Sequence, residues 1–201
     1  TSAEDCPVKV GYVACFDRPF EDLGGRLVSK AMDDRIATAI MAQALKDMKS
    51  TVNEVYFVFS TQEEVGLRGA TTSAYAIDPE IGFAIDVTPT LDTPKGAYND
   101  VKLGEGPAIK TKDSSLVVDP RVVAWMEKAA VSLGIPHQFE VITAGGTDGG
   151  AINITRSGVP AGCISVPTRY VHTPSEMVDY EDVLNCVKLT VELVSKPVDL
   201  G

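Results

Sequence analysis

The chain has 201 residues, of which 44% are apolar, and it carries a formal net charge of −10. This length fits one domain, or one domain together with a fragment of another. A nucleic-acid backbone or an anionic membrane surface would need clustered Lys and Arg on the protein. We therefore expect neither a nucleic-acid partner nor a membrane partner.

The four cysteines, Cys6, Cys15, Cys163 and Cys186, form no Cys-x-x-Cys pair. Cys163 lies within an apolar run and Cys186 within a helical pattern, which indicates buried, reduced thiols. Reduced thiols are typical of the cytosol, so we expect a cytoplasmic protein rather than one held together by disulfides.

The first half of the chain alternates between strand patterns and helix patterns. Apolar residues spaced three and four apart predict helices, and runs rich in β-branched and aromatic residues predict strands. The run VYFVFS is almost continuously apolar, which is typical of a strand buried on both faces. The predicted elements are a strand at Val8–Cys15, a loop at Phe16–Gly25, an extended run at Arg26–Ala31, a helix at Arg35–Met48, a strand at Val55–Ser60, a helix at Leu67–Ile77 and a strand at Ile81–Val87.

The second half continues the alternation, with clear signals at helix ends. Pro120 and Gly134 bracket one helical pattern, and Asp179 is a candidate N-cap for the last one. The predicted elements are a loop at Thr90–Asn99, a strand at Pro107–Thr111, a helix at Pro120–Leu133, a strand at Gln138–Ile142, a short helix near Ala151–Thr155, a strand at Ala161–Val166 and a final helix through Val194. Strands that alternate with helices predict an α/β fold, a three-layer sandwich with a largely parallel central sheet.

Side chains capable of binding metal follow four apolar runs. They are Asp33, Glu64, Asp86 and His172, and Glu63 stands beside one of them. If the strands are parallel, these groups meet at one edge of the sheet, where open α/β folds place their sites. Oxygen donors with one imidazole suit Zn²⁺, Co²⁺ or Mn²⁺ better than a structural thiolate site. We expect a divalent-metal centre there.

Each of these residues also has an ordinary interpretation. A Glu-Glu pair is usually surface decoration, and acids before a helix are usually caps. An Asp at the end of a strand is commonly a turn residue, and a single loop histidine is commonly hydrogen-bonded rather than a ligand. The other histidine, His137, has no acidic neighbours in sequence and is interpreted as structural. Only the shared position of the set favours a metal site.

Other catalytic classes find little support in the residues. The chain has no Gly-x-Ser-x-Gly motif of a serine hydrolase and no glycine-rich phosphate loop that ends in Lys-Ser or Lys-Thr. The segment AGGTDGG has glycines, but their spacing does not match a dinucleotide-binding turn.

Several segments together resemble a known family. They are GRLVSKAMDDR, VFSTQEEVGLRGA, AIDVT, LGEGP, GGTDGGAI and SGVPAGCISVPTRYVHTPSEMVD. They are similar to the dinuclear-metal aminopeptidases related to glutamyl aminopeptidase, deblocking aminopeptidase and the tetrahedral (TET) peptidases, some of which are labelled cellulase M or endoglucanase M. The resemblance runs from Gly25 to Asp179, in the order and with the spacing of the family.

The resemblance implies a role for each residue of the set. Asp33 would bridge two metal ions, Glu64 and His172 would complete one metal site, and Asp86 would belong to the other. Glu63 would be the general base and acid for a water activated by the two metals. The resemblance also implies a cis peptide bond between Asp33 and Asp34. The metals would be zinc or cobalt, with manganese as a third candidate.

The chain departs from the family in one respect. The family's remaining metal ligand is a histidine upstream of a β-rich inserted dimerisation domain, and an aspartate follows it closely; neither is in this sequence. We therefore expect residues 1–16 to be a remnant of that insert. Residues 17–201 would be a zinc-peptidase-like catalytic domain that is incomplete at its N-terminal side and lacks its first strands. The second metal would then bind weakly or not at all.

The function implied by the resemblance is metal-dependent removal of N-terminal residues from peptides. The partners would be peptide substrates and further copies of the chain, from a dimer to a dodecamer as in relatives. Two alternatives stay open: a non-catalytic metal-binding or assembly fragment of such an enzyme, inactive for want of the missing histidine, and a glycan hydrolase. No preference for the first residue of the substrate can be assigned.

Overall fold

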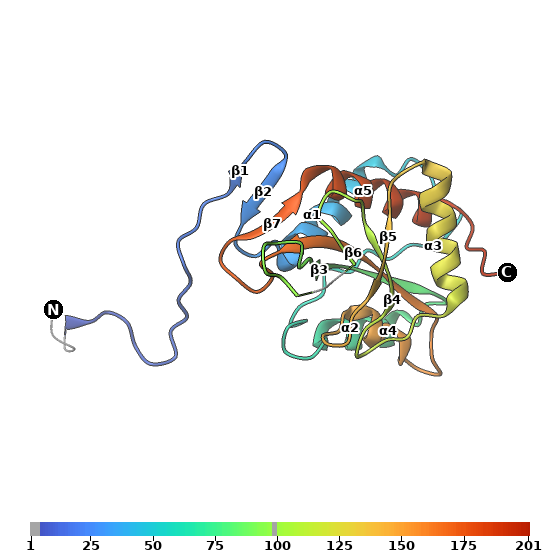
Figure 1. Cartoon of the computed structure of the whole chain (residues 1–201). Helices are drawn as coiled ribbons and strands as arrows, with labels where there is room; N and C mark the ends of the chain where they lie inside the picture. Colours follow the sequence, from blue (N-terminus) through green and yellow to red (C-terminus); the bar gives the residue numbers. More distant parts are fainter. Residues whose placement is uncertain (1–4, 98–99) are drawn as a thin grey trace.

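A computed structural model describes residues 5–97 and 100–201 of the chain. Helices lie on both sides of one sheet, with α1 and α5 on one side and α2 and α4 on the other (Figure 1). The α/β class and its three layers are therefore confirmed. The sheet contains seven strands, in the order β1-β2-β7-β6-β4-β5, and β3 pairs with β6.

The strands are short at one end of the sheet and long in its centre. Their bounds are β1 Glu21–Asp22, β2 Arg26–Ser29, β3 Gly82–Pro89, β4 Ala108–Lys112, β5 Gln138–Val141, β6 Ala161–Arg169 and β7 Glu176–Asp179. The pairings β3–β6 and β4–β5 are parallel, whereas the other four are antiparallel. The sheet is thus mixed, and the expectation of a largely parallel sheet was wrong. One reason is that β7 follows β6 without a helix between them, so the chain turns back beside β6 and forms an antiparallel pair.

The helices begin and end close to the predicted residues. Their bounds are α1 Met32–Asp47, α2 Arg68–Ile77, α3 Pro120–Leu133, α4 Asp148–Asn153 and α5 Tyr180–Ser195. The side chain of Asp119 accepts a hydrogen bond from the amide of Arg121 at the start of α3, and Gly134 ends that helix with a φ of 64°. Asp179 caps α5 in the same way. These caps satisfy amides that have no partner inside their helices.

The main core lies between the sheet and the helices α1, α3 and α5. Fully buried side chains from the two layers, such as Ile109 and Ile164 from the sheet and Met126 and Leu189 from the helices, belong to one cluster. Helix α3 approaches β6 closely at Gly162, where an added Cβ would lie 2.9 Å from both Met126 and Val122. A larger residue there would push α3 away from the sheet.

Four local predictions were wrong, and one of them is the loop at Phe16–Gly25, which contains the short strand β1. Val8–Cys15 and Val55–Ser60 are not strands, and the second run alternates between half-buried and exposed residues instead of being buried on both faces. Neither run has a strand partner among residues 5–97 and 100–201. Since a strand is defined by its hydrogen-bonded neighbour, apolar composition alone cannot make one. Helix α4 begins at Asp148, earlier than expected, because its first turn contains Gly149 and Gly150, which have a low helix propensity and hide the start in the sequence.

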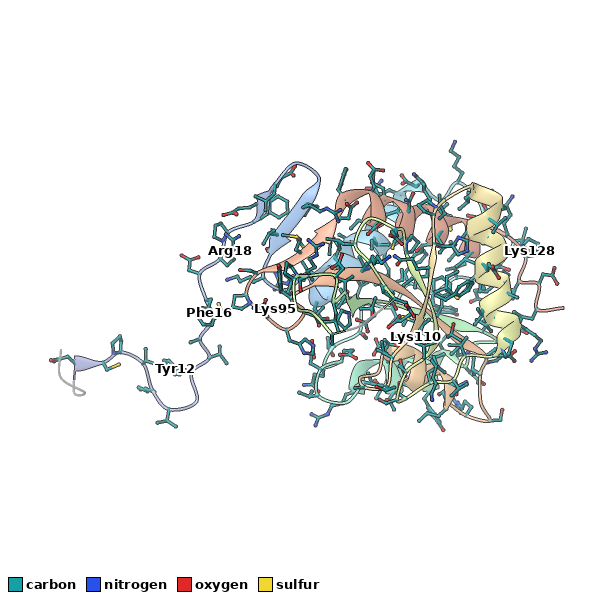
Figure 2. The ribbon with its side chains drawn as sticks, viewed as in Figure 1. Tyr12, Phe16, Arg18, Lys95, Lys110 and Lys128 are labelled. Carbon is teal, nitrogen blue, oxygen red and sulfur yellow. The ribbon has the colours of Figure 1, made fainter. Side chains whose placement is uncertain are left out.

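The segment at the N-terminal end of the described chain extends away from the body (Figure 1). Its apolar side chains are exposed, and Figure 2 shows Tyr12 and Phe16 along this extension. The predicted domain boundary between residues 16 and 17 stays a prediction. The predicted loop at Thr90–Asn99 has no helix or strand through residue 97, and residues 98–99 lie outside the described residues.

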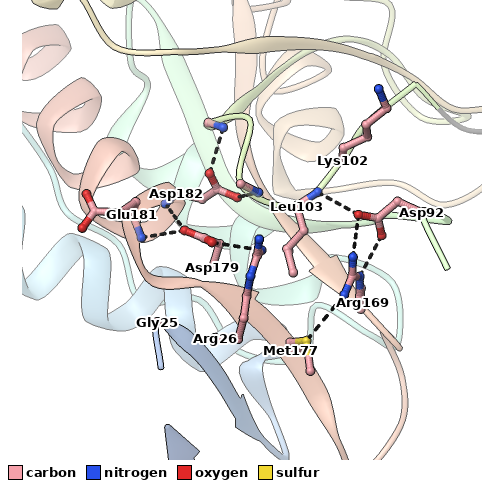
Figure 3. A network of polar contacts seen from close by, with 12 residues as sticks. Gly25, Arg26, Asp92, Lys102, Leu103, Arg169, Met177, Asp179, Glu181 and Asp182 are labelled. Atoms are coloured by element: carbon pink, nitrogen blue, oxygen red, sulfur yellow. Dashed lines mark hydrogen bonds and ion pairs between the residues drawn. The ribbon is translucent and has the colours of Figure 1, made fainter. Parts of the chain in front are cut away.

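Polar contacts fix the edge of the sheet that carries β2 and β7 (Figure 3). Arg26 of β2 forms an ion pair of 2.9 Å with Asp179. The carboxylate of Asp182, in the first turn of α5, accepts hydrogen bonds from the amides of Gly104 and Gly106 at 2.7 and 2.8 Å. These bonds join the strands, the final helix and the LGEGP loop into one unit.

A buried polar row crosses the centre of the sheet. The Nζ atom of Lys110 lies 2.6 Å from Oε1 of Glu140, and both side chains are almost fully inaccessible to solvent. Thr88 and Ser165 donate hydrogen bonds to the same carboxylate at 2.7 and 2.5 Å. The carboxylate is therefore satisfied without water, as a buried charge requires.

Within the described residues, no helix is long and apolar enough to cross a membrane.

Candidate metal centre

The metal-ligand candidates come from four different segments. Asp33 stands at the start of α1, directly after β2, and the peptide bond between Asp33 and Asp34 is cis, as the resemblance implies. Glu64 lies in the loop before α2, Asp86 lies in β3, and His172 lies in the connection from β6 to β7. All four lie toward the same region of the sheet.

Three of these residues meet at one point. The Nε2 atom of His172 lies 3.1 Å from Oδ2 of Asp33 and 3.3 Å from Oε2 of Glu64. Single donor atoms of the three residues all lie within 4.8 Å of one another. Two carboxylates and one imidazole can supply three of the four positions of a tetrahedral Zn²⁺ site and leave the fourth for water or substrate. The donor set therefore fits a divalent metal.

A second cluster shares Asp33 with the first. Asp33, Asp34 and Asp86 bring their carboxylates within 4.8 Å of one another. Burial raises the pKa of Asp34 and of Asp86, and in Asp34 the negative charge of Asp86 adds to the effect. Three carboxylates so close repel one another when ionised, and a cation between them would remove that repulsion. The sequence does not indicate Asp34 as a ligand, and the resemblance concerns only its peptide bond with Asp33.

Glu63 lies beside both clusters. Burial raises the pKa of its carboxyl group to about 7, and the charges of Glu64, Asp148 and Asp33 act in the same direction, whereas His172 opposes them. The pKa of Asp33 rises to about 6, also mainly through burial. These values describe the protein without metal, and a bound cation would lower them.

A cavity of about 380 Å³ opens beside the first cluster. Asp33, Glu64 and His172 line it together with Lys30 and Glu176. The side chain of His172 is 69% exposed and that of Glu64 56%, whereas that of Asp33 is only 10% exposed. The site is therefore open on the imidazole side, where a substrate could enter.

Three residues near the site were missed as functional candidates. Besides Asp34, they are Glu176, which accepts hydrogen bonds from the backbone amides of Asp33 and His172, and Asp148. Asp148 accepts a hydrogen bond of 2.5 Å from Ser60, and its second oxygen is buried without a hydrogen-bond partner. Both acids lie in segments that carry the family resemblance, but their sequence neighbours do not indicate what they contact.

His137 lies outside both clusters. Its ring packs edge-to-face against Phe139 with the ring centroids 5.9 Å apart, and its Nδ1 atom lies 3.4 Å from the carbonyl oxygen of Ile135. This arrangement is consistent with the structural role predicted for it.

The chain is similar in sequence to known proteins. The family model described as "M42 glutamyl aminopeptidase" matches residues 1–189. A protein named putative aminopeptidase from Acetivibrio thermocellus is 48% identical over 187 residues, which make up 93% of this chain and 57% of the relative.

Solved structures show the same similarity. The aminopeptidase APDkam598 from the archaeon Desulfurococcus kamchatkensis matches with a TM-score of 0.88 and 41% identity, over 90% of this chain and 52% of the other. The TET1 peptidase of Pyrococcus horikoshii matches with a TM-score of 0.81 and 32% identity, over 90% and 54%. The chain thus spans about half the length of the relatives it matches.

Proposed function

The chain belongs to the M42 glutamyl aminopeptidase family, and on that premise we propose that it supplies the metal-binding site of an enzyme that removes N-terminal residues from peptides. The observation that carries the proposal is the meeting of Asp33, Glu64 and His172 at one point beside an open cavity. The three residues come from separate segments, and unrelated acids on a protein surface are not expected to converge on one imidazole.

In this proposal, Asp33, Glu64 and His172 hold one divalent metal ion, zinc or cobalt. Asp33 turns its carboxylate toward both clusters, so it is the residue that would bridge to a second ion near Asp34 and Asp86. A divalent ion at such a site polarises a peptide carbonyl and makes water more acidic. With only carboxylates in the second cluster of the described chain, we expect the second ion to bind more weakly than the first.

Glu63 is the proposed proton carrier. It precedes the ligand Glu64 in the same loop and lies close enough to Asp33 and His172 for their charges to act on it. A carboxylate in that position can accept a proton from the attacking water and then deliver it to the nitrogen of the departing amine. The carboxylates that hold the metal are ionised when they bind it and therefore have no proton to exchange.

Assembly and location belong to the same proposal. The P. horikoshii TET1 peptidase assembles into a tetrahedron or a large octahedral shell, and we propose that this chain also forms homo-oligomers. Cys163 and Cys186 are buried and free, and Cys6 and Cys15 are exposed and free, which supports a reducing, cytoplasmic location. The glycan-hydrolase alternative is not favoured, because the family model that matches residues 1–189 is described as an aminopeptidase.

The test is an aminopeptidase assay on the purified chain, combined with a measurement of its intact mass. Leucyl, glutamyl and lysyl amides are offered separately with added Co²⁺ or Zn²⁺, and amine release is compared with that of a Glu63→Gln preparation. We expect metal-dependent release from at least one amide. Release no faster than with the Glu63→Gln protein, for all three amides and both metals, would overturn the proposed activity.

A further inference from the structure

Glu176 joins the two segments that carry the proposed metal ligands. It is the first residue of β7, and it is only 2% exposed. Its Oε2 atom accepts a hydrogen bond of 3.0 Å from the backbone amide of Asp33, and its Oε1 atom accepts one of 2.8 Å from the backbone amide of His172. Each oxygen of one carboxylate therefore holds the backbone of one ligand.

These two segments need support, because their backbones are strained. His172 has a φ of 62°, and Ala31, two residues before Asp33, has a φ of 55°. Residues other than glycine avoid this left-handed region, and they stay in it only where surrounding contacts hold them. A charge-assisted hydrogen bond from the amide of His172 itself is such a contact.

The sheet register places Glu176 where it can reach both segments. Glu176 pairs with Ser29 at the end of β2, and the chain enters α1 only three residues later. The connection that contains His172 leads directly into β7. The buried carboxylate thus lies at the corner where the start of α1 meets this connection, on the inner side of the cavity.

We propose that Glu176 is a positioning residue that sets the distance between Asp33 and His172, and thereby the metal affinity of the first site. This inference rests on the proposed function, since it assumes that the two side chains share a metal. Glu176 acts through the two backbones and does not itself contact the metal. Partners that orient metal ligands in this way commonly change affinity 10- to 100-fold when they are replaced.

The chemistry of the side chain makes the role specific. Glutamine has nearly the same shape but only one acceptor oxygen, and its NH₂ group would face one of the two amides donor to donor. Glu176→Gln therefore releases one ligand segment while it keeps the volume of the buried side chain. Aspartate is one methylene shorter, so Glu176→Asp keeps the charge but shortens the reach to the two amides.

The experiment is a Co²⁺ titration of the full chain. Calorimetry measures the affinity, and the visible spectrum of the bound ion reports its coordination. The matched control is Val178→Ala, which removes apolar contacts from the same strand at a residue with 0% exposure, without touching either amide. We expect a loss of Co²⁺ affinity of about 10- to 100-fold and an altered visible spectrum in Glu176→Gln. Val178→Ala should keep the affinity and spectrum of the original protein, although both variants lose stability.

The outcomes of this titration distinguish failure of the positioning role from failure of the proposed function. If Glu176→Gln binds Co²⁺ as tightly as the original chain, or if Val178→Ala loses as much affinity, the positioning role is wrong and the proposed function is untouched. If the original chain itself does not bind Co²⁺, the proposed function fails and this inference fails with it.

A second measurement covers the case in which Glu176→Gln does not fold. Hydrogen exchange of the metal-free original chain, read by NMR, should show slow exchange of the amides of Asp33 and His172. Exchange of both amides as fast as that of unbonded loop amides would overturn the inference without any variant.

Discussion

The Nε2 atom of His172 lies 3.1 Å from Oδ2 of Asp33, although the two residues are far apart in the chain. The antiparallel pairing of β2 with β7 accounts for this, because it sets Ser29 beside Glu176 and so brings the start of α1 next to the β6–β7 connection. Glu64 arrives from a third segment, the loop before α2, and completes the group. The sheet register therefore creates the candidate metal centre.

Replacing Glu63 should separate catalysis from metal binding. Glu63→Gln removes the proposed proton acceptor, so amide hydrolysis should fall roughly 100- to 10,000-fold while Co²⁺ affinity stays nearly unchanged. Glu64→Gln is the matched comparison in the adjacent residue and should lose Co²⁺ affinity as well. Rates and calorimetric titrations of both variants check this. Near-normal turnover in Glu63→Gln would remove Glu63 from the mechanism.

The buried ion pair of Lys110 and Glu140 should be essential to stability. Lys110→Met leaves the buried carboxylates of Glu140 and Asp113, 2.6 and 3.6 Å from the Nζ atom of Lys110, without their cation, which should lower the free energy of unfolding by about 3–5 kcal/mol. The control is Lys128→Met on the outer face of α3, where the ion pair with Asp199 is exposed and worth little (Figure 2).

The double variant Lys110→Met with Glu140→Met removes the cation and one of its two carboxylates, so it should recover only part of the loss, because Asp113 stays buried without its cation. Urea denaturation of the three variants measures these differences. Equal losses in Lys110→Met and Lys128→Met would show that burial of the pair has no energetic consequence.

Stability should fall as the pH rises through the titration range of Asp182. Burial raises the pKa of this carboxyl group from 3.8 to about 6, against the opposing hydrogen bonds from Gly104 and Gly106. The folded protein then binds this proton more tightly than the unfolded chain does. The stabilisation that this proton gives the folded state is complete below about pH 4 and is lost as the pH rises past 6. It amounts to at most about 3 kcal/mol.

Figure 3 shows Asp182 within its network of polar contacts, and Asp182→Asn should lack this pH dependence. The difference in unfolding free energy between the original chain and the variant should therefore shrink between pH 4 and pH 7. Asp47→Asn, at the exposed end of α1, controls for the loss of one negative charge. A difference that stays constant with pH would contradict the assigned cause.

Local signals in the sequence were enough for several elements. Pro120 and Gly134 mark the two ends of α3 by their own backbone preferences, and the structure has that helix at the predicted residues. Asp179 marks α5 in the same way. In such cases the residues that decide the structure are neighbours in the chain.

Non-local features could not be predicted in this way. The run Val55–Ser60 has strand composition, but a strand also needs a partner that composition does not reveal. Strand β7 has only four residues, Glu176–Asp179, and follows directly after Pro174 and Ser175, so no strand is predicted there and its antiparallel pairing is missed. The carboxylate of Glu176 binds an amide 143 residues away in the chain, a relationship that no local pattern encodes.

Zinc titration by calorimetry tests the central claim most directly, on the original chain, His172→Ala and Asp86→Asn. Because Asp33, Glu64 and His172 form the proposed primary site, the original chain should show one tight binding event. Asp86→Asn should keep this event, and His172→Ala should lose it. Tight zinc binding that survives in His172→Ala would contradict the claim that these three residues hold the metal.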